Sequence, residues 1–74
     1  MGNSKSVLPL TFVEGTTILE MLSEMREKAI KFEVAYTSTT INGIQVFVSQ
    51  NAKINESFEK YHRAVSEKNV YVVC

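Results

Sequence analysis

FEVAYTSTTINGIQVFVSQ, residues 32–50, contains two runs of β-compatible residues joined at Asn42-Gly43. An Asn-Gly pair between alternating apolar runs is the strongest short-range signal for a β-hairpin, because both residues tolerate the positive φ angles of a type I′ turn. With these two residues as the loop, Ile41 pairs with Ile44. The stretch therefore predicts two antiparallel strands, the first beginning near residue 32, with a polar tip that projects into solvent.

Helical spacing of apolar residues predicts one helix before the hairpin and one after it. The first begins with a capping box, in which Thr17 and Glu20 satisfy each other's backbone N–H groups, and it ends at about Lys31. The second is capped by Asn51 or Asn55. Each helix buries one apolar stripe, which contains Ile18, Leu22, Met25 and Ala29 in the first and Ile54, Phe58, Tyr61 and Val65 in the second.

Short apolar runs near both ends complete the predicted architecture. Residues 7–13 (VLPLTFV) and 70–74 (VYVVC) are typical of short strands, although Pro9 cannot donate to a strand ladder. The order β-α-β-β-α-β predicts an α+β fold, a two-layer ferredoxin-like sandwich with an antiparallel four-stranded sheet and two helices on one face. The first and third strands are central in that fold. The alternative is a hairpin with helices, whose terminal segments pair elsewhere or with a partner chain.

Size and charge bound the function. The chain of 74 residues fits a flexible segment of residues 1–6 and a single α+β domain of residues 7–74. Eight basic and eight acidic residues cancel, which makes a nucleic-acid partner unlikely because such affinity comes largely from phosphate neutralisation. One cysteine excludes an internal disulfide, and no apolar run approaches the roughly 20 residues that span a bilayer. These features predict a cytoplasmic protein.

The N-terminal hexapeptide MGNSKS matches the N-myristoylation pattern M-G-x-x-x-[ST], which places a lipid on Gly2. These six residues resemble the N-terminus of the recoverin family of myristoylated calcium sensors. The resemblance implies a lipid and not calcium binding, because the chain has no Asp for a calcium-binding loop. One acyl chain gives only marginal, reversible binding, so we expect a weak, peripheral membrane association. The alternative is a chance match.

The sequence has no recognisable catalytic or metal-binding pattern. His62 and Cys74 are the only residues of their types, and nothing supplies an orienting third group or a glycine-rich oxyanion loop. One His and one Cys fall short of the three or four ligands of a metal site. The Glu residues of the predicted helices face Lys or Arg at helical spacing, as exposed salt-bridge partners do. We therefore predict a non-enzymatic protein without metal or cofactor, in which His62 faces solvent.

The sheet face opposite the helices is the predicted interaction surface. Phe47 and Ala35 point to this side if both helices cover the other. The final strand adds alternate residues, either Tyr71 and Val73 or Val70 and Val72. Exposed aromatic and β-branched side chains on a sheet need cover or a purpose. We predict self-association as a homodimer, or binding of another protein, through Phe47, Ala35, Tyr71 and Val73.

Three classes of function compete. The first is a regulatory or protein-interaction domain that binds itself or another protein, and we favour it. The second is a small-ligand-binding, sequestering protein with a pocket between paired chains, by analogy with ferredoxin-like regulators. The third is a nucleic-acid-binding regulator. Residues 58–61 (FEKY) follow the hairpin in a way that is similar to the Phd/YefM antitoxin pattern, but extra residues separate strand and helix, and the chain ends in a strand. RNA-recognition modules carry a basic and aromatic strand that residues 43–48 (GIQVFV) do not match.

Overall fold

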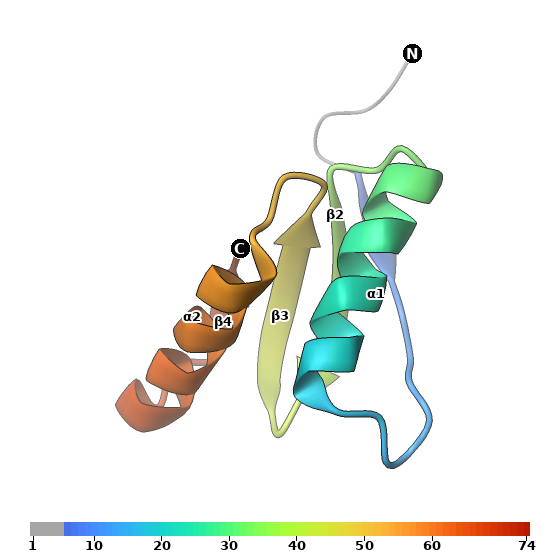
Figure 1. The fold of residues 1–74 in the computed structure, drawn as a ribbon. Coiled ribbons are helices and arrows are strands. Elements are labelled where there is room, and N and C mark those ends of the chain that lie inside the picture. The colour runs from blue at the N-terminus through green and yellow to red at the C-terminus, as the bar shows by residue number, and fades with distance from the viewer. Residues whose placement is uncertain (1–5) are drawn as a thin grey trace.

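The computed structural model describes residues 6–74, which form two helices and a four-stranded mixed sheet. The elements, in chain order, are β1 (Val7–Pro9), α1 (Ile18–Lys31), β2 (Tyr36–Ile41), β3 (Ile44–Ser49), α2 (Ile54–Glu67) and β4 (Tyr71–Val73). In Figure 1 both helices lie in front of the sheet, with α1 over β2 and α2 over β4. The α+β class and the predicted order of elements are confirmed.

The strand order differs from that of a ferredoxin-like sandwich. Neighbouring strands follow chain order, β1-β2-β3-β4. The outer pairs β1–β2 and β3–β4 are parallel, and only the central pair β2–β3 is antiparallel. The predictions of an antiparallel sheet and of a central first strand are therefore wrong, whereas the third strand is central as predicted. Two βαβ units stand side by side, and the hairpin joins them.

Pro9 gives a physical reason for the edge position of β1. The Tyr36 N–H donates to the Ser6 carbonyl at 3.1 Å, and the Leu10 N–H donates to the Ser38 carbonyl at 2.7 Å. Backbone groups of successive strand residues point to opposite sides, so the Pro9 nitrogen points away from β2. That nitrogen has no hydrogen to donate, which is harmless at an open edge and would break a ladder bond in a central strand.

The turn and the register of the central hairpin agree with their predictions, but the predicted projection of a polar tip into solvent is wrong, because Ile41 and Ile44 beside the turn are buried in the core. Asn42 and Gly43 form the turn with φ angles of 52° and 81°. Ile41 pairs with Ile44, as predicted. The Asn42 side chain also donates from Nδ2 to the hydroxyl of Tyr61 at 3.0 Å, which ties the turn to α2.

Both of the first two strands are shorter than predicted. β1 ends at Pro9 instead of continuing to residue 13. β2 begins at Tyr36 instead of near residue 32, because the chain there still completes the end of α1. The Phe32 N–H donates to the Lys28 carbonyl at 2.9 Å, and Glu33 adopts a left-handed φ of 53°. A strand cannot begin until this turn is complete.

The two helices begin differently. The predicted capping box of α1 is confirmed: the Glu20 N–H donates to Thr17 Oγ1 at 3.2 Å, and the Thr17 N–H donates to Glu20 Oε1 at 3.0 Å. Lys53 occupies the N-cap position of α2 and makes no side-chain capping hydrogen bond. The predicted caps Asn51 and Asn55 are therefore wrong. A lysine side chain has no acceptor atom, so it cannot satisfy the free N–H groups of the first turn.

The core lies between the helices and the sheet. Val46 and Val48 of β3 are fully buried against α1 and α2, whereas Gln45 between Ile44 and Val46 is exposed. Thr37 of β2 is also fully buried, and its hydroxyl donates to the Met25 carbonyl of α1 at 2.8 Å. The buried apolar residues are Leu22, Met25, Ala29, Ile41, Ile44, Val46, Val48, Ala52, Tyr61 and Ala64.

Candidate interaction surface

The sheet face opposite the helices carries an apolar cluster, here called the open-face patch. Its residues come from all four strands and are Val7, Tyr36, Phe47, Tyr71 and Val73. Phe47 lies between the fully buried Val46 and Val48, so its side chain points away from the helices. Strand pairing sets Val7 beside Tyr36 and Phe47 beside Val73, which makes the patch continuous across the sheet.

The geometry of the open-face patch is that of a shallow apolar hollow. Val7, Tyr36, Phe47 and Val73 line a space of about 300 Å³. The rings of Tyr36 and Phe47 meet edge to face, with centroids 6.4 Å apart and an interplanar angle of 85°. The side chains at the rim remain in water, since Val7 is 44% exposed, Val73 45% and Tyr71 60%. Among residues 6–74, no acidic or basic side chain lines this hollow.

The structure brings together three of the four predicted surface residues. Phe47 pairs with Val73, and Tyr71 lies two residues before Val73 on the same side of β4. This settles which alternate residues of β4 share the face with Phe47. Ala35 lies elsewhere: it precedes β2, is half-buried, and donates its N–H to the Ser6 hydroxyl at 3.1 Å.

Sequence reasoning missed Tyr36, although a signal for it exists. Directly paired residues of an antiparallel hairpin share one face of the sheet. The predicted pairing of Ile41 with Ile44 extends along the hairpin to Thr37 and Val48, which pair in the structure. Thr37 therefore faces the core with Val48, and Tyr36 must face the open side. The polar character of β2 concealed this alternation.

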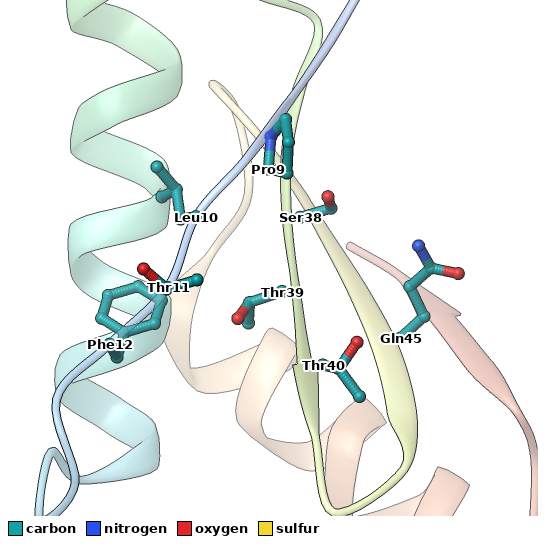
Figure 2. A pocket seen from close by; sticks show the side chains of 8 residues that line it. All are labelled: Pro9, Leu10, Thr11, Phe12, Ser38, Thr39, Thr40 and Gln45. Carbon is teal, nitrogen blue, oxygen red and sulfur yellow. The ribbon is translucent and has the colours of Figure 1, made fainter.

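A second hollow opens beside β2, where the segment that follows β1 turns away from this strand after Pro9. It has a volume of about 370 Å³, and Figure 2 shows Thr39 and Thr40 of β2 beside the departing segment of residues 10–12. The polar groups that line it are the hydroxyls of Thr11, Ser38, Thr39 and Thr40 and the amide of Gln45. None of the lining residues is charged. This polar hollow can form hydrogen bonds to a neutral ligand, but it offers no charge for a phosphate or metal ion and no group for proton transfer.

His62 and Cys74 lie in different environments. His62 is exposed on α2, as predicted, and its ring meets the Phe58 ring edge to face at 4.4 Å. Cys74 is a free, half-buried cysteine whose side chain packs against the core. Within residues 6–74, no group of three or more His, Cys, Asp or Glu side chains could hold a metal ion. The surroundings of His62 and Cys74 therefore do not identify them as a catalytic pair.

The predicted lipidation site, Gly2, lies outside the described residues, so its acylation stays a prediction. In the described part of the chain, neither helix is both long and apolar enough to cross a membrane. Comparisons with models of protein families, with curated proteins and with solved structures found no match. The open-face patch and the polar hollow are therefore the candidate sites of the described residues.

Proposed function

We propose that this chain is a non-enzymatic protein-interaction domain that self-associates as a homodimer through its sheet. The observation that carries the proposal is the open-face patch, where one apolar hollow includes a side chain from each of the four strands. Removing apolar surface from water is favourable by about 25 cal/mol per Å². A second protein surface that covers the hollow gains this free energy, which a monomer leaves unused.

A second copy of the chain has the chemistry that this surface requires. In a two-fold dimer the same patch contributes to both sides of the interface. The described residues that line the hollow are uncharged, so contact between them in two copies buries no unpaired charge, whereas a charged partner would lose its hydration there without compensation. A domain of this size also has a small core, and an added apolar interface extends it.

Paired phenylalanine variants test this proposal. Sedimentation equilibrium should show a dimer of the wild-type chain at micromolar to submillimolar concentrations. Phe47→Gln should weaken dimerisation by about tenfold or more, because it replaces the central aromatic side chain of the patch with a polar one. Phe32→Gln is the matched control, since Phe32 is 52% exposed but lies at the end of α1, outside the patch.

Two results would contradict self-association through the patch. One is a wild-type chain that stays monomeric throughout this concentration range. The other is an equal effect of Phe47→Gln and Phe32→Gln, which would show a general response to lost apolar surface. Circular dichroism of both variants verifies that they are folded.

The polar hollow of Figure 2 supports a second candidate function, binding of a small neutral ligand. Its hydroxyl and amide groups suit a ligand with several hydrogen-bonding groups and no charge, such as a sugar or a small amide. When such compounds are titrated into the protein, the amide chemical shifts of Ser38 and Thr40 should change at the lowest ligand concentrations. Thr40→Val, which removes one exposed hydroxyl with little change in shape, should weaken binding. Shifts spread evenly over the surface would exclude a site here.

A further inference from the structure

The hydrogen bonds of β4 identify the backbone groups that have no partner strand. The Val70 carbonyl and the Cys74 N–H both bond to β3, at 3.0 and 2.8 Å. Successive strand residues alternate in direction, so the intervening Val72 also faces β3. Tyr71 and Val73 therefore direct their N–H and C=O groups to the other side. No strand of residues 6–74 lies there, because β4 ends the sheet.

The outer edge of β4 is complementary to itself. If two copies of β4 run antiparallel about a two-fold axis at Val72, Tyr71 of one copy lies opposite Val73 of the other. Both residues direct their N–H and C=O groups outward. Tyr71 of one copy and Val73 of the other can therefore each donate an N–H to the carbonyl of the other, as in a hydrogen-bonded antiparallel pair. No shift of register and no bulge is needed. A second copy of the chain thus supplies the matching donors and acceptors.

The edge also lacks the features that protect exposed strands from pairing. Proline, charged residues and bulges commonly prevent edge-to-edge association. Residues 70–74 (VYVVC) include no proline and no charged residue. Val70, Tyr71 and Val73 are also 72%, 60% and 45% exposed. The opposite edge of the sheet, β1, contains Pro9. No side-chain charge of β4 therefore opposes pairing with an uncharged β-strand, and a second β4 is such a strand.

Pairing at β4 would also extend the open-face patch. Residues directly opposite in an antiparallel pair have side chains on the same face. Tyr71 and Val73 of both copies would therefore meet on the open face and join the two patches across the axis. Because β4 has only three residues, side-chain burial of this kind must supplement its main-chain hydrogen bonds.

We propose that two copies of the chain pair through β4, antiparallel about Val72, and so join two four-stranded sheets into one eight-stranded sheet. Pairing at β4 rests on the proposed self-association and adds an edge-to-edge contact to it. This contact places the two open-face patches side by side, so covering the hollow requires a separate face-to-face contact. The partner is a second copy of this chain.

Amide hydrogen exchange of the unmodified full chain tests the pairing without any substitution. The amides of Tyr71 and Val73 should exchange about tenfold or more slowly at concentrations where the dimer dominates than at concentrations where the monomer dominates. The amide of Val72, which faces β3 in either state, is the internal reference. A dimer in which Tyr71 and Val73 show no such slowing would overturn the proposal.

A pair of variants gives an independent readout. Val73→Pro removes an outward-facing N–H and no bond to β3, so it should weaken dimerisation by about tenfold or more while the fold persists. Val73→Thr keeps the N–H and the β-branched shape and should dimerise nearly as the wild type does. A dimer that survives Val73→Pro but is lost in Phe47→Gln overturns pairing at β4 and leaves self-association through the open face standing. A wild-type chain that is monomeric at every concentration overturns both.

Discussion

The two halves of the molecule, β1-α1-β2 and β3-α2-β4, share one plan but differ at their ends. Each half is a βαβ unit with two neighbouring parallel strands and a helix of 14 residues. The first half has a capping box at the start of its helix and a proline in its edge strand. The second half has neither a side-chain cap nor a proline. Local interactions thus define the first half, whereas packing on the sheet must hold the second.

The largest expected effect concerns whether the halves fold together. Leu22 of α1 and Tyr61 of α2 are both almost completely buried in the shared core. Leu22→Ala should lower the free energy of unfolding by about 2–5 kcal/mol and Tyr61→Ala by about 3–5 kcal/mol, because each leaves a cavity. Urea unfolding should show one transition in every case.

Leu19→Ala is the control for this experiment, since Leu19 lies on the same helix as Leu22 but is 45% exposed. It should change stability by less than about 0.5 kcal/mol. Two separate transitions in either core variant would show that the halves are independent units. The two halves would then be separate domains.

The next effect tests the missing cap of α2 directly. Lys53→Ser supplies an oxygen for the free N–H groups of the first turn and should raise the free energy of unfolding by about 1 kcal/mol. Thr17→Ala, at the equivalent position of α1, should lower it by a similar amount. Lys53→Ala is the control because it also removes the exposed Lys53–Glu56 pair, 4.0 Å apart, and adds no acceptor. Equal stability of Lys53→Ser and Lys53→Ala would mean that no cap is missing.

A smaller effect concerns the feature that the halves share. Glu33 follows α1 and Lys68 follows α2, each in the left-handed region with φ angles of 53° and 59°. Side chains are disfavoured there and glycine is not. Glu33→Gly and Lys68→Gly should each stabilise the fold by about 0.5–1 kcal/mol in thermal unfolding. Glu33→Ala and Lys68→Ala keep a side chain in the left-handed region and should not stabilise the fold. If Lys68→Ala did stabilise it, backbone strain would not be the cause.

The same contrast explains which features the sequence predicts. The turn at Asn42-Gly43 and the capping box of α1 depend on residues within four positions of each other, and both are correctly predicted. The start of α2 depends on distant packing, because Ala52, which directly precedes the N-cap Lys53, is buried in the core. Asn51 and Asn55 have favourable capping chemistry but the wrong positions.

Strand order is the least local property, and it is where prediction failed. A central β1 that includes Pro9 would have required a donor that this residue lacks, so Pro9 favours the edge position. The open-face patch was predicted in part, because alternation along β3 places Phe47, whereas the choice between the two alternate pairs of β4 required its pairing with β3. Val7 joins them only through the parallel pairing of β1 with β2. That pairing has no short-range signal.

The smallest effect distinguishes the two helix starts by their response to pH. The Thr17 backbone N–H, followed by the Thr17 hydroxyl, lowers the pKa of the Glu20 carboxyl below its ordinary value of 4.5. A carboxyl whose pKa is lower in the folded state stabilises the fold above its unfolded pKa and loses this contribution as the pH falls through its folded pKa. The stability advantage of wild type over Glu20→Gln should therefore shrink as the pH is lowered from 6 towards 3, in urea titrations at constant ionic strength. In a Thr17→Ala background the pH-dependent part of this difference should be smaller but should persist, because the hydroxyl is lost while the backbone N–H of residue 17 remains. A difference that persists unchanged in that background would show that the Thr17 hydroxyl contributes nothing to it, and the start of α1 would then differ from that of α2 by less than the capping box implies.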